Sequence, residues 1–139
     1  MINKAIIMAG GSGTRLKPLT NYLNKHLLPI YNKPMIFYPL SLLIYAKVKE
    51  ILIICNKEDL KTFRKILFKF QSKYKIKLKY KIQVKKGGGI AQGLILAKNF
   101  LSNTKKFALI LGDNFFFGKE FPKILNTNLQ KKSKNSCIF

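Results

Sequence analysis

Acidic side chains are scarce in this sequence of 139 residues, which holds 5 Asp and Glu against 27 Lys and Arg and has a formal net charge of +22. Arginine is scarce as well, because only Arg15 and Arg64 accompany the lysines, which are scattered along the whole chain. Specific readout of nucleic-acid bases relies on the bidentate arginine fork. We therefore expect a solvated lysine-rich surface and no specific nucleic acid as partner, with a basic nucleic-acid-binding module as the less favoured alternative.

Long hydrophobic runs and cysteine pairs are missing too. No apolar stretch approaches the roughly 20 residues that a membrane span needs, and the amino terminus lacks the pattern of a cleaved leader. Cys55 and Cys137 lie far apart, without CxxC or histidine-rich spacing, which predicts neither a disulfide framework nor a zinc site. We expect a soluble cytoplasmic protein with no membrane partner and with buried, reduced thiols.

Apolar residues are plentiful, at 47% of the chain with 11 Phe and 6 Tyr, and this content predicts a packed core. Hydrophobic periodicity predicts strands at residues 4–9, 51–55, 76–83 and 107–111. It predicts helices at residues 40–48, 58–70, 90–101 and 119–132. Because strand and helix alternate, we expect an α/β fold with a doubly wound, mostly parallel sheet and helices on both faces. Residues 136–139 resemble the start of a further strand, so residues 1–139 are expected to form one incomplete domain.

The loop at residues 9–16 reads AGGSGTRL and directly follows the first predicted strand. In sheets of this kind ligands bind beyond the carboxyl ends of the strands. Glycines let backbone N–H groups approach an anion, and Arg15 adds a guanidinium that can bind two phosphate oxygens. The loop therefore predicts a phosphate site of a kind that is neither Walker A nor GxGxxG, with an ordinary glycine-rich turn as the alternative.

Two further loops place charged residues at the same predicted edge. Lys25 lies in an apolar surround and can bind phosphates as a point charge, while a structural or surface role is favoured over a catalytic base for His26, the only histidine. Asp113 follows the apolar strand predicted at 107–111, at the place where Mg²⁺ carrying a nucleotide's phosphates would lie. A turn or helix-cap role for Asp113 is the alternative.

Amide and aromatic side chains near this edge could bind a base. Gln83 offers a donor and an acceptor to a pyrimidine edge, and the glycines at 87–89 would let a base lie flat against the backbone. The phenylalanines at 115–117 could stack on a sugar or base, although packing is the commoner role of aromatics after a core strand.

Four ordered motifs over nearly the whole chain resemble those of the sugar-phosphate nucleotidyltransferases, and within them the glucose-1-phosphate thymidylyltransferases. The motifs are AGGSGTRL, KHLLPIYNKPMIFYPL, Gln83 with its glycine turn and Ala91-Gln92, and LGDNFFFG. The resemblance implies a Rossmann-like fold and Mg²⁺-dependent transfer of a thymidylyl group from dTTP to glucose 1-phosphate, giving dTDP-glucose and pyrophosphate. It also implies a place in dTDP-rhamnose synthesis and homo-oligomeric full-length relatives.

The resemblance also implies roles for individual residues of this sequence. The triphosphate would be held by the first loop, at Gly10, Gly11, Gly13 and Thr14. Arg15 and Lys25 would be the catalytic cations, neutralising the α-phosphate and the departing pyrophosphate. Thymine would contact Gln83 and Gly89, and Asp113 would bind Mg²⁺.

The sequence departs from the family pattern in three places and in length. His26 stands where the family has Gln, Asn32 stands where it has Asp, and the glycine turn after Gln83 is one residue longer. Family members are about twice as long, and the resemblance implies that the other half carries a second Mg²⁺-binding Asp and most glucose-binding residues. Residues 1–139 would thus be the nucleotide-binding portion of the domain, and an inactive nucleotide-binding remnant is the alternative to an active enzyme.

Overall fold

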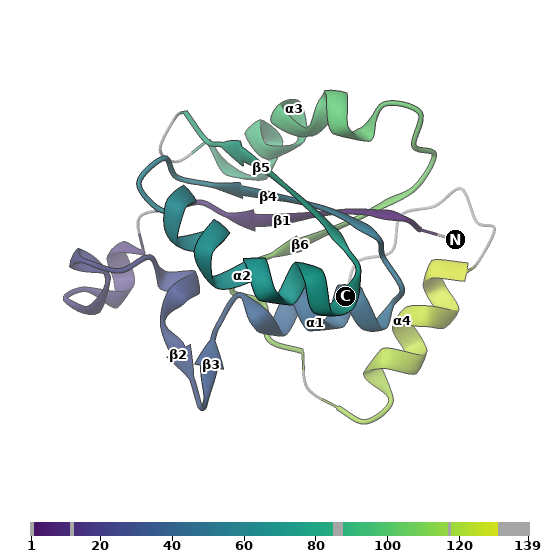
Figure 1. Cartoon of the computed structure of the whole chain (residues 1–139), viewed down its shortest axis with the longest axis horizontal. Coiled ribbons are helices and arrows are strands. Elements are labelled where there is room, and N and C mark those ends of the chain that lie inside the picture. The colour runs from purple at the N-terminus through teal and green to yellow at the C-terminus, as the bar shows by residue number, and fades with distance from the viewer. Residues whose placement is uncertain (1, 12, 85–87, 117, 131–139) are drawn as a thin grey trace.

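A computed structural model of the chain describes residues 2–11, 13–84, 88–116 and 118–130. Its centre is a four-stranded sheet with the strand order β5-β4-β1-β6, in which every neighbouring pair is parallel (Figure 1). The strands are β1 (Lys4–Ala9), β4 (Glu50–Cys55), β5 (Lys77–Ile82) and β6 (Phe107–Leu111). The predicted parallel sheet is confirmed.

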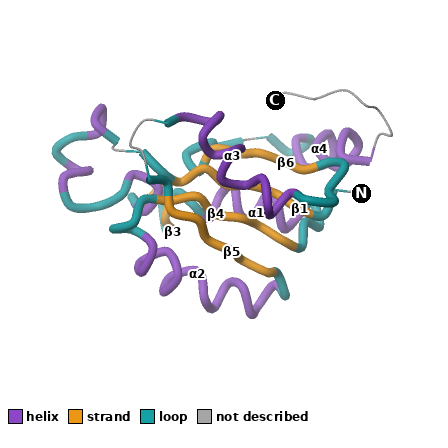
Figure 2. Tube along the Cα trace, turned by 90° about the horizontal axis from the view of Figure 1, so that it is seen from above, coloured by secondary structure: helices purple, strands orange, loops and turns teal. Residues whose placement is uncertain are grey.

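The strands differ in hydrophobic pattern because they differ in position. β1 and β4 lie inside the sheet, and five of the six residues of each are buried, which explains their continuous apolar runs. β5 lies at one edge and alternates exposed lysines with half-buried apolar residues, as the sequence pattern predicted. Figure 2 shows β5 and β6 at opposite edges of the sheet.

Helices cover both faces of the sheet (Figure 1). They are α1 (Phe37–Tyr45), α2 (Leu60–Tyr74), α3 (Gly89–Leu101) and α4 (Phe121–Gln130). The larger core packs side chains of α1, α2 and α4 against one face, and the smaller core packs α3 against the other. The predicted doubly wound arrangement is confirmed, and none of the described helices is long and apolar enough to cross a membrane.

A reversal in chain direction creates the crevice where a ligand can bind. From β1 the chain runs outward to β4 and then β5, and α3 carries it back to β6 on the far side of β1. Because parallel crossovers are right-handed, this reversal places α3 on the face opposite to α1 and α2. The carboxyl ends of β1 and β6 therefore flank a topological switch point.

Most predicted element bounds differ from the observed ones by a few residues. The helix predicted at 40–48 begins at Phe37, because Pro39 lies in the first turn, where no intrahelical N–H is needed. The predictions also missed a small hairpin of β2 (Pro29–Ile30) and β3 (Lys33–Pro34), as well as three single-turn 3-10 helices. The strand predicted at 136–139, Cys137, and Gly87 of the glycine cluster lie outside the described residues.

Candidate functional site

Side chains and glycines from several elements meet at the carboxyl edge of the sheet. A pocket of about 250 Å³ opens there beside the ends of β1, β5 and β6. Six residues assigned from the sequence line it: Gly10, Gly11, Lys25, Gln83, Gly89 and Asp113. The structure thus brings together the first loop, the Gln83 amide and the acidic residue after β6.

Close contacts and backbone geometry favour glycine in the first loop. A Cβ on Gly10 would overlap the amide oxygen of Gln83. Gly13 has φ +57°, and a Cβ there would lie 2.8 Å from Cγ2 of Thr20. The Gly13 carbonyl accepts hydrogen bonds from Oγ1 of Thr20 at 2.7 Å and from the backbone N–H of Leu16 at 2.9 Å. These bonds turn the chain sharply after β1.

The second part of the first loop lies away from the pocket wall. Thr14 and Arg15 belong to a single 3-10 turn, Thr14–Leu16, and both are exposed. Of the described residues, Gly13, Thr14 and Arg15 are not among those that line the pocket. Their assignment to the triphosphate stays a prediction.

Lys25 and Asp113 form an ion pair at the pocket. Nζ of Lys25 lies 2.5 Å from Oδ2 of Asp113, and the two side chains are 24% and 35% exposed. Burial pushes the pKa of Asp113 upward, but the hydrogen bond and the charge of Lys25 outweigh burial and hold that pKa below its ordinary value. Asp113 is therefore ionised at neutral pH, next to a cation that can exchange it for a phosphate.

His26 also lines the pocket and is buried there, with 1% of its surface exposed. Oδ1 of Asn24 lies 2.7 Å from Nδ1 of His26 and accepts the His26 backbone N–H at 2.9 Å. Since the Asn24 oxygen acts as acceptor, Nδ1 of His26 carries the proton and donates it. Burial lowers the pKa of His26 to about 4, with Lys25 adding to this effect and Asp113 opposing it. The position agrees with the structural role expected for this residue.

The Gln83 amide is held in place by its neighbours. Its backbone N–H donates to the Cys55 carbonyl at 2.8 Å, and its side-chain Nε2 donates to Oε1 of Gln92 at 3.1 Å. The Gln83 side-chain oxygen lies against Gly10, and a Cβ on Gly88 would overlap the Gln92 amide. Gly10 and Gly88, which have no side chain, thus leave room for the amides of Gln83 and Gln92.

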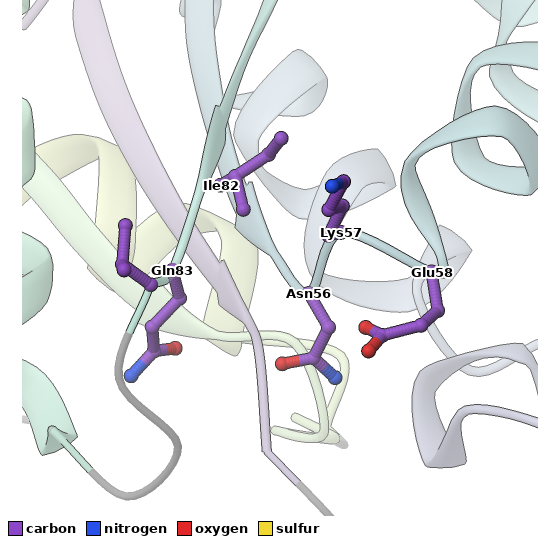
Figure 3. Close-up of a pocket in the computed structure, with 6 residues that line it drawn as sticks. Asn56, Lys57, Glu58, Ile82 and Gln83 are labelled. Carbon is purple, nitrogen blue, oxygen red and sulfur yellow. The ribbon is translucent and has the colours of Figure 1, made fainter.

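A second pocket of about 300 Å³ lies beyond Gln83, between the ends of β4 and β5. Figure 3 shows the side chains of Asn56 and Gln83 leaving these two strand ends in the same direction. Sequence reasoning missed Asn56, although the rule that found Asp113, a polar residue one or two positions after an apolar strand, would also have found it. No role was predicted for Asn24 or Asp59 either, whereas Gln92 was named only as part of the motif that follows Gln83.

The phenylalanines after β6 pack against protein side chains. The ring of Phe115 meets that of Tyr38 edge-on at 4.7 Å, and the ring of Phe116 stacks on that of Phe121 at 4.7 Å. Phe117 lies outside the described residues. Phe115 and Phe116 thus make the packing contacts that are common for aromatics after a core strand.

Among the residues that the structure describes, Asp113 is the one carboxylate that lines the first pocket. No group of three or more His, Cys, Asp or Glu suited to a metal occurs among the described residues. Mg²⁺ commonly takes one or two protein carboxylates together with substrate phosphates and water. A single carboxylate therefore fits a metal that arrives with a triphosphate, and does not fit a metal held by protein side chains alone.

Comparisons with known proteins agree with the fold. A sequence profile described as nucleotidyl transferase matches residues 4–139. Glucose-1-phosphate thymidylyltransferase of Neisseria gonorrhoeae is 46% identical over 136 residues, covering 98% of this chain and 46% of that enzyme. The protein of the same name from Mycolicibacterium smegmatis is 44% identical over 115 residues, covering 83% of this chain and 39% of that enzyme.

A solved structure is similar over nearly the whole chain. It comes from Bacillus anthracis, is assigned provisionally as a glucose-1-phosphate thymidylyltransferase, and contains sucrose. It matches with a TM-score of 0.79 at 38% identity, covering 92% of this chain and 51% of that one. The chain thus spans about half, or less, of the length of these relatives.

Proposed function

Since the chain belongs to the nucleotidyl transferase family, we propose that it binds dTTP in the first pocket and transfers the thymidylyl group to glucose 1-phosphate. The products are dTDP-glucose and pyrophosphate. One observation carries the proposal: Gly10, Lys25, Gln83 and Asp113, from four separate segments, line one pocket at the switch point of the sheet. Relatives named glucose-1-phosphate thymidylyltransferase support the choice of nucleotide and sugar.

The proposed reaction needs no covalent protein nucleophile. A phosphate oxygen of glucose 1-phosphate attacks the α-phosphorus of dTTP in line, the new P–O bond forms, and the bond to pyrophosphate breaks. The protein contributes by positioning the two phosphates and by stabilising their charge. In this proposal the loop at Gly10, Gly11, Gly13 and Thr14 holds the triphosphate, while Arg15 and Lys25 neutralise the α-phosphate and the leaving pyrophosphate.

Asp113 is the proposed ligand of Mg²⁺. Bound there, the ion would supply positive charge that neutralises the triphosphate. Lys25 now pairs with the Asp113 carboxylate. For Asp113 to bind the ion, the Lys25 ammonium group would leave the carboxylate and pair with a phosphate of dTTP instead.

Gln83 and Gly89 are the proposed contacts of the thymine. The Gln83 oxygen can accept the base N3–H, and an Nε2 hydrogen can donate to a carbonyl of the base. Gly89 lines the same pocket and has φ +62°, so that backbone rather than a side chain meets the base there.

The biological setting is proposed from the same family resemblance. The reaction would take place in the cytoplasm, where nucleoside triphosphates are made, and would lead toward dTDP-rhamnose. Full-length relatives would act as homo-oligomers, and specific nucleic acid would not be a partner.

One alternative is dTTP binding without turnover. The chain covers 46% of the Neisseria enzyme, and the resemblance places most of the glucose site in the part of that enzyme that the chain does not match. A protein that holds the nucleotide but does not position the sugar phosphate would be stabilised by dTTP without forming product.

One set of measurements tests the proposal. The protein is mixed with dTTP, glucose 1-phosphate and Mg²⁺, pyrophosphate release is followed, and thermal unfolding is measured with and without dTTP, with Arg15→Ala as the control. Turnover supports the enzyme, and dTTP-dependent stabilisation without pyrophosphate supports the alternative. The proposal is wrong if dTTP has no effect, and DNA that then binds with a steep salt dependence would favour the basic nucleic-acid-binding module.

A further inference from the structure

We propose that Asp59 is a positioning residue, which fixes the glycine loop and the Lys25 turn relative to each other through the side-chain amides of Asn24 and Asn56. We call these three side chains the Asp59 network. The inference rests on the proposed function, because it concerns how the same pocket would be kept ready for a triphosphate.

Asp59 is the common acceptor of the network. Its Oδ2 accepts Nδ2 of Asn24 at 2.5 Å and Nδ2 of Asn56 at 3.0 Å. Asp59 stands at the N-cap position of α2, yet its side chain makes no capping hydrogen bond. An aspartate here would ordinarily cap the helix. Its carboxylate instead joins two loops that are far apart in the sequence.

Asn56 connects Asp59 to the glycine loop. Its Oδ1 accepts the backbone N–H of Gly11 at 3.4 Å, and its Nδ2 donates to the Gly11 carbonyl at 3.3 Å. One side chain thus contacts both polar backbone groups of Gly11, much as a neighbouring strand would. Gly11 lines the pocket, so the orientation of Asn56 sets the direction of backbone at the proposed phosphate site.

Asn24 connects Asp59 to the turn that carries Lys25. It is buried, its Nδ2 also donates to the Ala9 carbonyl at 3.4 Å, and its Oδ1 accepts both hydrogen bonds of His26. The side chain is the N-cap of the single turn Lys25–Leu27. All polar atoms of the Asn24 amide are used, which defines one orientation and places Lys25 next to Asp113.

The charge of Asp59 argues that its role is positional. A carboxylate near the glycine loop repels a triphosphate, and the chain has only 5 acidic residues. Hydrogen bonds to an ionised acceptor are about twice as strong as those between neutral groups. Both amides donate to the same oxygen, so an amide at residue 59 could accept both bonds without the charge. An alanine could accept neither.

The test measures dTTP binding by calorimetry for wild type, Asp59→Ala, Asp59→Asn and Glu58→Ala. Glu58 is the exposed acid next in sequence, so its replacement removes the same charge without touching the network. We expect Asp59→Ala to weaken binding about 10-fold or more, Asp59→Asn to stay within about 3-fold of wild type, and Glu58→Ala to bind as tightly as wild type or more tightly. If charge alone mattered, both alanine variants would bind more tightly.

A second measurement needs no ligand. Amide hydrogen exchange by NMR reports the Gly11 N–H, which we expect to exchange about 10-fold faster in Asp59→Ala and in Asn56→Ala than in wild type. If Asp59→Ala does not fold, Asn56→Ala tests the network in its place, because it removes the Gly11 contacts and leaves the hydrogen bond from Asn24 to Asp59 intact. Unchanged Gly11 exchange and unchanged dTTP affinity overturn the inference. Failure of wild type to bind dTTP overturns the proposed function alone, since the exchange rates still test the network.

Discussion

The centre of the sheet and the loops at its carboxyl edge are held together by different forces. In β1 and β4 buried aliphatic side chains pack on both faces of the sheet. At the edge, the Asp59 network and the Lys25–Asp113 pair connect loops by directional polar contacts. Burial of apolar area supplies most of the folding free energy, whereas a polar contact contributes little net stability but fixes geometry. The comparison predicts that stability and ligand binding respond to different substitutions.

The largest effect is expected in the centre. Phe63 of α2 is completely buried, and Phe63→Ala should lower the free energy of unfolding by about 3–5 kcal/mol, because a cavity is left in the larger core. Urea denaturation measures the change. Phe68→Ala on the same helix is the control, since Phe68 is 67% exposed and its loss should change stability by less than about 1 kcal/mol. Equal changes in the free energy of unfolding for the two variants would contradict the burial of Phe63 in the larger core.

His26 is a buried polar residue at the carboxyl edge, and it should make stability depend on pH. Its pKa is about 4 in the folded protein against 6.5 for the free side chain, so the unfolded chain binds more protons between these values. The free energy of unfolding should therefore fall as the pH is lowered from 6.5 to 4, by roughly 3 kcal/mol in total. Asp113, whose pKa is lowered from 3.8, adds its own loss only at still lower pH.

Urea denaturation at several pH values between 7 and 4 checks this dependence. His26→Gln carries the residue typical of the family and cannot titrate, so its stability should lack the fall over that range. A wild-type stability that is constant between these pH values would show that His26 is not buried as a neutral ring.

At the carboxyl edge, Lys25→Met should reduce binding without reducing stability. Loss of the ammonium group should weaken dTTP binding by about 10- to 100-fold, whereas the partly exposed ion pair contributes less than about 1 kcal/mol to folding. Calorimetry and urea denaturation measure the two quantities on the same samples. Lys61→Met, which removes an exposed lysine of α2, is the control for net charge. If Lys25→Met bound dTTP as tightly as wild type, the assignment of Lys25 to the proposed site would be wrong.

The smallest effect is expected for Gln92, which contacts the proposed base site only through Gln83. Gln92→Leu removes the acceptor of the Gln83 amide, so the preference for dTTP over dCTP should fall by about 3- to 10-fold. Gln92→Glu keeps an acceptor oxygen and should retain most of the preference. The ratio of the two dissociation constants is the measurement, and a ratio unchanged in Gln92→Leu would contradict the role of this contact.

The centre of the sheet could be predicted from the sequence because burial leaves a periodic record. The strands at 4–9 and 107–111 have the predicted bounds, and the alternation at 76–83 correctly indicated a strand with one solvated face. The β2–β3 hairpin could not be predicted, because it pairs only two residues on each side and both strands contain a proline.

The carboxyl edge could be predicted only in part. Gly10 and Asp113 were found because each directly follows or nearly follows an apolar strand, whose end locates them at one edge. The Asp59 network could not be found in this way, since its bond from Asn24 to Asp59 spans 35 positions of the chain. Loop side chains carry no periodic signal, and which of them meet is decided by the packing of the elements between them.

The lysines of β5 affect how one copy of the chain meets another. Lys77, Lys79 and Lys81 are exposed along a strand that ends the sheet on that side. A second molecule that tried to extend the sheet there with its own β5 would bring two rows of ammonium groups together, and their mutual repulsion opposes such an addition. Added salt shortens the range of that repulsion. Higher ionic strength should therefore favour self-association at the β5 edge, whether or not a nucleotide is bound.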